Sequence, residues 1–131
     1  MTYTIKDVCQ KLNLTPHTVR HYCDNGLVPN LRRDAAGNRI FDEESLNWLQ
    51  AAVFLRAAGM PVHEVRCYFL LCQKGEEALP ERVKILESLQ KQAETEMRQA
   101  QARFECLTRK LAHCRDIMDG KCPDDCNPMN W

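Results

Sequence analysis

The sequence lacks any long hydrophobic run. Across its 131 residues, no apolar stretch approaches the ~18 residues that a membrane-spanning helix requires. The N-terminus also lacks the basic segment followed by an apolar segment that marks a secretory signal. We therefore expect a cytoplasmic protein with no membrane partner. Its length suits one globular unit, or a small domain with an appendage.

The residue patterns of common enzyme sites are missing as well. No paired carboxylates, phosphate-binding loop or nucleophile–base arrangement stands out, and the four histidines have no evident partner. A catalytic site needs such a constellation of groups. We therefore expect no catalytic residues and consider binding functions instead.

Neither sign of charge is in excess, since 18 basic residues face 18 acidic ones. The distribution is uneven, however. Residues 1–42 carry six Lys/Arg against four Asp/Glu, whereas residues 75–131 carry nine against eleven. A mildly basic N-terminal part favours contact with nucleic acid there.

One stretch, from Leu14 to Pro29, organises the rest of the chain and reads L-T-P-H-T-V-R-H-Y-C-D-N-G-L-V-P. Thr15 is a good N-cap, and Pro16 suits the first helical position, where its missing N–H costs nothing. Asn25-Gly26 supplies a stop. The stretch therefore predicts a short helix whose polar first turn can present hydrogen-bond donors to a nucleic-acid groove.

The preceding segment, Tyr3 to Leu14, predicts another short helix, capped by Thr4 and with an apolar stripe that includes Val8. Two short helices joined by the tight Asn13-Leu14 turn form a helix-turn-helix, with the second helix in the recognition position. The alternative is the corner of an ordinary all-α core.

The segment from Asn30 to Phe41 predicts a β-hairpin, because two short arms flank a turn rich in Asp, Gly and Asn. Basic residues lie on both arms, and beside a helix-turn-helix such a hairpin is a wing. Arg33 and Arg39 are then expected to reach phosphates on either side of the groove. The alternative is a solvated basic loop.

Two further helices are expected after the hairpin. The first begins after Asp42, which caps it, and ends at Gly59, with Trp48 in the core. The second is expected to span Val62 to Cys72.

From Leu79 to Met118 the apolar residues recur every seven positions in two rows, with charges elsewhere. A seam kept for about five heptads predicts a coiled coil. At ~1.5 Å rise per residue this helix is roughly 58 Å long, so it must pack against another long helix, which the chain lacks. A homodimer is therefore expected. The rows are Val83, Gln90, Met97, Phe104, Leu111 and Met118, and Leu86, Ala93, Ala100, Leu107 and Cys114.

Together these elements predict a mainly α fold. A winged helix-turn-helix DNA-binding domain is expected over residues 1–74, followed by a coiled-coil dimerisation helix over residues 75–118. Gly120 and two prolines then prevent the helix from continuing into a Cys-containing C-terminal tail, residues 119–131.

The motifs T-P-H-T-V-R-H-Y, N-G-L-V-P and G-N-R-I-F, followed by two helices and a coiled coil, resemble the MerR family of bacterial transcription regulators. The resemblance runs from about Tyr3 to Met118. It implies a homodimer through an antiparallel coiled coil, with two winged domains on two half-sites of a dyad. It also implies that binding bends and untwists promoter DNA, so that RNA polymerase is affected indirectly.

The resemblance also implies roles for individual residues. Arg20, Tyr22 and Arg39 match family positions that look like phosphate contacts, whereas the start of the recognition helix offers base contacts. His21 stands where the family usually has Tyr. The predicted DNA-contacting residues are Thr15, His17, Thr18, Arg20, His21, Tyr22, Arg33, Asn38 and Arg39.

Within the family, W-L-x-x-x-V-x-L-R-x-x-G-M-P-V-x-x-V-R-x-Y and P-E-R-V-x-I-L resemble the subgroup that answers aldehydes and other electrophiles, and so point to a stress response. That subgroup commonly uses a cysteine on the third helix, where this sequence has Phe54. The heavy-metal subgroup has cysteines in a loop after the dimer helix, the region of Cys122 and Cys126.

Cysteine itself is abundant, with eight residues, and in the cytoplasm thiol chemistry or metal binding is a better expectation than disulfides. Cys9 and Cys23 are expected to pack as small hydrophobes. Cys122 and Cys126 form a candidate site for a thiophilic metal ion or for a reversible disulfide. Such an ion is the one cofactor that the sequence suggests. Electrophile or small-molecule sensing, metal sensing and no sensing role all remain open. The sensor candidates are Cys67, Cys72, Cys114, Cys122 and Cys126.

The leading hypothesis is thus a dimeric, effector-responsive regulator that binds promoter DNA. The competing hypothesis is a coiled-coil adaptor that uses the helix-turn-helix for protein contacts. The basic wing argues against the adaptor.

Overall fold

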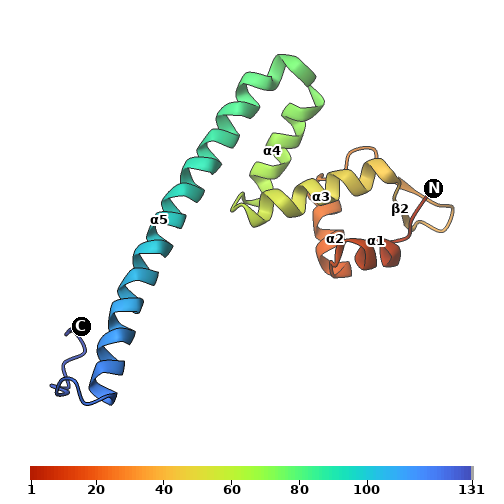
Figure 1. The fold of residues 1–131 in the computed structure, drawn as a ribbon. Coiled ribbons are helices and arrows are strands. Elements are labelled where there is room, and N and C mark those ends of the chain that lie inside the picture. Colours follow the sequence, from red (N-terminus) through yellow and green to blue (C-terminus); the bar gives the residue numbers. More distant parts are fainter. Residues whose placement is uncertain (131) are drawn as a thin grey trace. The chain divides into compact units, whose positions relative to one another are not determined.

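The computed structural model describes residues 1–130, and they divide into two units, Met1–Leu89 and a second unit from Gln90 onward. The chain is mainly helical, with a small hairpin after the first two helices and a long last helix, as predicted (Figure 1). In order, the elements are α1 (Ile5–Leu12), α2 (Pro16–Asp24), β1 (Arg32–Arg33), β2 (Arg39–Ile40), α3 (Glu43–Ala57), α4 (Val62–Gln73), the 3-10 turn η1 (Gly75–Ala78) and α5 (Leu79–Met118).

Helix α1 begins after the predicted cap, Thr4, and ends before the predicted Asn13-Leu14 turn. At its start, Thr4 and Asp7 form a capping box, in which each side chain accepts a hydrogen bond from the other's backbone N–H. Tyr3 is held out of the helix because it pairs with Phe41 through two backbone hydrogen bonds of 2.7 and 3.0 Å. At its end, Asn13 takes a left-handed conformation with φ of 53°, which stops the helix.

Helix α2 begins and ends as predicted. Thr15 is the N-cap and Pro16 takes the first helical position. At the end, the N–H of Leu27 donates to the carbonyl of Tyr22 and that of Gly26 donates to Cys23, which is a Schellman motif. Gly26 has a φ of +76°, and a Cβ there would lie 3.3 Å from Nε of Arg66, so glycine suits both the turn and the packing.

The predicted wing is confirmed as an antiparallel hairpin, with Arg32 opposite Ile40 and Arg33 opposite Arg39. Asp34 organises its turn, because one carboxylate oxygen accepts from the backbone N–H groups of Ala36 and Asn38.

One hydrophobic core joins the first four helices to the wing and so fixes the direction in which α2 faces. As predicted, Asp42 caps α3 by accepting from the N–H of Ser45 at 2.8 Å. Trp48 packs edge-on against Phe69, with ring centroids 4.8 Å apart. The buried residues of this core are Val8, Val19, Tyr22, Leu27, Val28, Phe41, Leu46, Leu49, Ala52, Leu55, Met60, Val65 and Phe69.

Helix α5 contains no buried residue along its 40 residues. Ile85 and Leu89, near its start, pack against the core of the first unit, whereas the predicted heptad rows carry exposed apolar side chains. Within residues 1–130, no helix combines the length and apolar character needed to cross a bilayer.

In the second unit, the tail folds back beside the end of α5 (Figure 1). Lys110 Nζ donates to the carbonyls of Pro128 and Asn130 at 3.2 and 3.4 Å. Within the tail, Asn130 donates to the Asp125 carboxylate, which also accepts from the N–H of Asn127. Hydrogen bonding to these two residues lowers the pKa of Asp125.

Candidate nucleic-acid interface

Helix α2 presents a polar, exposed stripe made of His17, Arg20 and His21. The two imidazole rings are separated by one helical turn and lie nearly parallel, with centroids 6.4 Å apart and an angle of 7° between their planes. These three residues were predicted from the sequence as DNA contacts, and the structure places all three on the surface.

At the start of α2, the two threonines share one hydrogen-bond network. The Thr15 hydroxyl accepts from the N–H of Thr18 at 3.1 Å and donates to the Thr18 hydroxyl at 2.9 Å. The hydroxyl proton of Thr15 is therefore used within the protein, whereas the hydroxyl of the half-buried Thr18 accepts that bond and keeps its own proton for another partner. Of the two predicted contacts, Thr18 is the better donor to a ligand, and Thr15 is mainly a helix cap.

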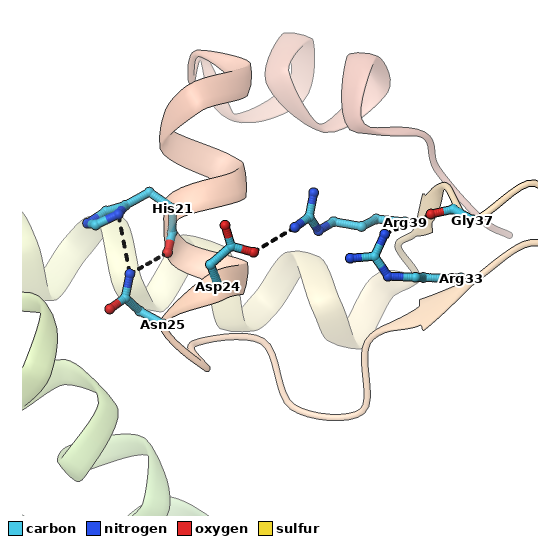
Figure 2. Close-up of polar contacts among 6 residues, drawn as sticks. All are labelled: His21, Asp24, Asn25, Arg33, Gly37 and Arg39. Atoms are coloured by element: carbon cyan, nitrogen blue, oxygen red, sulfur yellow. Dashed lines mark hydrogen bonds and ion pairs between the residues drawn. The ribbon is translucent and has the colours of Figure 1, made fainter.

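The wing is tied to α2 by an ion pair. Nη2 of Arg39, on β2, donates to Oδ1 of Asp24 at 2.7 Å (Figure 2). Arg33 lies opposite Arg39 in the hairpin, and its Nη1 donates to the carbonyl of Gly37 at 2.7 Å. Two arginines directly opposite each other repel, so the pair is better accommodated when an anion lies nearby.

These arginines line a pocket of about 480 Å³ between the wing and the start of the chain. Arg20 of α2 lines it too, so arginines from α2 and from both strands of the wing line one pocket. Asp34 also lines the pocket, but its Oδ1 is used by backbone N–H groups of the wing turn. Arginines suit phosphate oxygens because each offers several N–H donors in a fixed plane. The pocket is lined by Thr2, Tyr3, Thr4, Ile5, Arg20, Arg33, Asp34, Gly37, Asn38, Arg39 and Ile40.

Tyr22 does not join the exposed stripe. Tyr22 is only 8% exposed and belongs to the hydrophobic core. The ring completes the apolar face of α2, and the predicted phosphate contact, which the phenol hydroxyl would have to make, stays a prediction. Asn38, by contrast, is exposed in the wing, as its predicted role requires.

Two polar residues at the end of α2 were missed by the sequence analysis. Asp24 binds Arg39, and Asn25 hydrogen-bonds to both the ring and the carbonyl of His21 (Figure 2). Asn25 follows His21 by four residues, which makes them neighbours on a helix, so spacing alone could have suggested this contact. No sequence signal pairs Asp24 with the distant wing residue Arg39.

The eight cysteines are free thiols that differ in exposure. Cys23 is half-buried, and this burial raises the pKa of its thiol to about 11. Cys9 and Cys23 both pack against the core, as predicted. Among the sensor candidates, Cys67, Cys114 and Cys126 are exposed, whereas Cys72 and Cys122 are half-buried.

Within the part of the chain that the structure describes, no group of three or more His, Cys, Asp or Glu side chains lies close enough together to hold a metal ion. Two thiolates alone leave a zinc-type site incomplete, because such sites take four ligands. Cys122 and Cys126 of a single chain therefore do not fit a resident metal ion without further donors.

The family model described as MerR HTH family regulatory protein matches residues 3–70. An uncharacterized HTH-type transcriptional regulator of Haemophilus influenzae is 30% identical over 112 residues, covering 86% of this chain and 83% of that protein. The HTH-type transcriptional regulator AdhR of Bacillus subtilis is 32% identical over 82 residues, covering 63% of this chain and 59% of that protein.

Two solved structures agree with these sequence matches. HiNmlR, a MerR family regulator lacking the sensor domain and crystallised with promoter DNA, has a TM-score of 0.77 at 28% identity, covering 91% of this chain and 94% of that chain. A MerR family regulator from Bacillus thuringiensis has a TM-score of 0.73 at 27% identity, covering 86% of this chain and 99% of that chain. These relatives are transcription regulators and not enzymes. The chain belongs to the MerR HTH family of DNA-binding transcription regulators.

Proposed function

We propose that this protein is a homodimeric, effector-responsive regulator that binds a dyad in promoter DNA and distorts that DNA to control transcription. The carrying observation is the row of exposed apolar side chains along α5. The proposal draws on the likeness to HiNmlR, which is bound to promoter DNA in its crystal structure.

The dimer is inferred from the apolar surface that α5 leaves exposed to solvent. Phe104 is 70% exposed, and its heptad neighbours Met97 and Leu107 are exposed by 64% and 63%. Burying one such side chain stabilises a structure by about 1.5–3 kcal/mol. A second copy of the same helix offers a matching two-row seam, which we expect to pack antiparallel. The exposed apolar residues of α5 are Leu79, Val83, Leu86, Met97, Phe104, Leu107, Leu111 and Met118.

A dimer would carry two copies of α2 and two wings, which suits a DNA site with two-fold symmetry. In each copy, Arg20 and the two wing arginines would contact phosphates, while the first turn of α2 meets base edges. The phosphate contacts would fix the position of the protein on the duplex. The free-energy cost of deforming the DNA between the promoter elements would then set the geometry of the promoter. RNA polymerase would respond to that geometry, and no direct contact between the regulator and the polymerase would be needed.

The dimer is tested by a matched pair of substitutions. Ala100 lies on the seam and Ala102 lies two residues away, off both rows, and both are exposed in the single chain. Ala100→Glu places a charge in the seam and is expected to give a monomer in sedimentation analysis, with weak binding to dyad DNA. Ala102→Glu has the same effect on helix propensity and should stay dimeric. A dimeric Ala100→Glu variant would contradict the proposed seam.

For the effector, we propose thiol-based sensing of electrophiles or another small molecule, in line with the motifs shared with the electrophile-responsive subgroup. The third-helix position of that subgroup's cysteine is held by Phe54, which is 70% exposed, so the sensing thiol would lie elsewhere. Among the candidates that are exposed in the single chain, Cys67 and Cys126 lie off the proposed seam, whereas Cys114 lies on it.

The alternative is a thiophilic metal-responsive regulator with the ion at Cys122 and Cys126, completed by donors from outside the single chain. Metal analysis of anaerobically purified protein, beside a variant with both cysteines changed to Ser, separates the two. Stoichiometric metal in the parent and none in the variant would favour the metal alternative. Metal-free parent protein would favour thiol or small-molecule sensing.

The non-DNA-binding adaptor is tested by titrating fluorescent duplex DNA with the protein at low salt. DNA binding that weakens steeply with added salt is expected from released counterions. No binding at low salt would favour the adaptor.

A further inference from the structure

Asn25 makes two hydrogen bonds to one residue, His21. Its Nδ2 donates to the backbone carbonyl of His21 at 2.7 Å, and the same atom lies 3.2 Å from Nδ1 of the His21 ring (Figure 2). A backbone carbonyl can only accept a hydrogen bond, so the amide must turn its NH₂ group, and not its oxygen, toward His21.

This orientation decides which ring nitrogen of His21 carries the proton. One N–H of the amide is used by the carbonyl, and the other points at Nδ1. Nδ1 must then accept through its lone pair, and in a neutral imidazole the proton sits on Nε2. The contact with Asn25 therefore selects the tautomer that offers an N–H at the tip of the ring.

The selected N–H belongs to an exposed side chain. His21 is exposed and stacks one turn along from His17 on the stripe that also carries Arg20. An exposed N–H donor pairs with an acceptor, and DNA offers phosphate oxygens everywhere and N7, O6 and O4 atoms in the major groove. The opposite tautomer would present a lone pair, which such acceptors repel.

We propose that Asn25 is a positioning residue that holds His21 as an Nε2–H donor, and that this donor forms a hydrogen bond to an acceptor on duplex DNA. The proposal rests on the DNA binding proposed above and deepens it, because it assigns the chemistry of one contact and the residue that sets it. The acceptor is a base-edge atom or a phosphate oxygen.

Asn25 would not need this ring contact if it were only a helix cap. Its backbone N–H already donates to the carbonyls of Cys23 and His21 at the end of α2. The side-chain bond to the carbonyl strengthens that cap, but the approach to Nδ1 adds nothing to capping. A test must therefore separate ring positioning from helix stability.

The tautomer is measured directly by long-range ¹H–¹⁵N NMR of the full chain, at a pH where imidazoles are neutral. The expected spectrum has a protonated Nε2 and an unprotonated Nδ1 for His21, with His21→Ala used for assignment. In Asn25→Asp the carboxylate can only accept from Nδ1, so the Nδ1 signal should shift toward the protonated form. A protonated Nδ1 in the parent protein would overturn the proposal.

The DNA contact is tested with a dyad duplex selected by the protein from a random library. His21→Ala is expected to weaken binding about tenfold, the effect of losing one well-formed hydrogen bond. His21→Gln, whose amide N–H reaches a similar place, should stay within about twofold of the parent. Equal affinity of His21→Ala and the parent would overturn the proposal.

The coupling of the two residues is tested with Asn25→Asp in the parent and in the His21→Ala background. The added charge repels DNA in both, but only the parent can also lose the Nε2–H donor, so the loss should be larger there. Equal losses would overturn the positioning role. Melting temperatures of all variants separate these effects from loss of the helix end.

Binding measurements on two duplexes, the selected one and an unrelated one, identify the acceptor. A loss confined to the selected duplex assigns a base-edge atom, whereas an equal loss on the selected duplex and on an unrelated one assigns a phosphate oxygen. Either result supports the donor role. Failure of the parent protein to bind any duplex at low salt would instead reject the DNA-binding proposal itself, which distinguishes the two failures.

Discussion

Arg39 reaches from the wing to the last residue of the recognition helix, where its Nη2 lies 2.7 Å from Oδ1 of Asp24. The Arg39 side chain is only 16% exposed, while that of Asp24 is 65% exposed. The guanidinium is thus largely enclosed and already paired. Arg39 therefore ties the wing to α2, and this role is distinct from the phosphate contact proposed for it.

Replacing Arg39 with Ala is expected to weaken binding to all duplex sequences alike, because wing placement and phosphate attraction carry no sequence information. Titrations with a selected dyad duplex and an unrelated duplex measure this. A loss confined to the selected duplex would contradict the assignment.

Asp24→Ala separates the two roles of Arg39. If wing placement dominates, removing the carboxylate weakens binding as Arg39→Ala does, since the wing loses its anchor. If phosphate attraction dominates, Asp24→Ala strengthens binding, since a negative charge is removed and the guanidinium is released. We expect weaker binding, because the ion pair is short and its arginine is mostly enclosed.

Arg20→Ala is expected to weaken binding uniformly and to lower the slope of log K against log salt by about two, because a dimer would lose one phosphate contact in each of its two copies. Arg20 is exposed on α2 and lines the basic pocket. Titrations at several salt concentrations measure the slope. The control is Arg98→Ala, which removes an exposed arginine that pairs with Glu94 on α5 and is not one of the pocket-lining residues. An unchanged slope for Arg20→Ala would contradict the phosphate contact.

Local signals in the sequence predicted most of the fold. Thr15, Asp42 and the Asn25-Gly26 stop act within four residues of where they stand, so their positions set the ends of α2 and the start of α3. The heptad rows likewise predicted the bounds of α5. Thr4 and the Asn13-Leu14 turn likewise set the ends of α1. The pairing of Tyr3 with Phe41 was not predicted, because contacts at that separation leave no local pattern.

The difference between local signals and long-range contacts also explains which features of the candidate interface could be predicted. Exposure of His17, Arg20 and His21 follows from the apolar face of α2, whose residues Val19 and Tyr22 turn inward. The family motif did not show that the Tyr22 ring packs in the core, because a motif marks a position but not the direction of its side chain. The Arg39–Asp24 pair depends on tertiary geometry and could not be predicted, whereas the contact of the Thr15 hydroxyl with Thr18 is local to the predicted cap.

Cys23 is expected to react slowly with thiol reagents. Burial raises its pKa to about 11, so at pH 8 only about one thiol in a thousand is the reactive thiolate, against roughly one in four for a free cysteine. Mass spectrometry after timed iodoacetamide treatment at pH 8 measures each site. Cys67 and Cys126, which are exposed, should be labelled first. Early labelling of Cys23 would contradict its packing against the core.

The Asp42 cap is expected to make the stability of the first unit depend on pH in the acidic range. The N–H of Ser45, followed by its hydroxyl, donates to the carboxylate and lowers the pKa of Asp42 below its usual range. Because the folded-state pKa lies below the unfolded one, the carboxylate's contribution is fully present above the ordinary Asp pKa near ~3.9. That contribution is lost as pH falls through the lower, folded-state value.

Asp42→Asn keeps an N-cap of similar rank but cannot titrate. Urea unfolding of both proteins, at one fixed concentration because dimerisation also affects stability, is compared from pH 7 down to pH 3. The parent should lose more unfolding free energy than Asp42→Asn over the acidic end of that range, because only the parent protonates its cap. Parallel pH profiles would show that the Asp42 carboxylate contributes no charge-dependent stability to the start of α3.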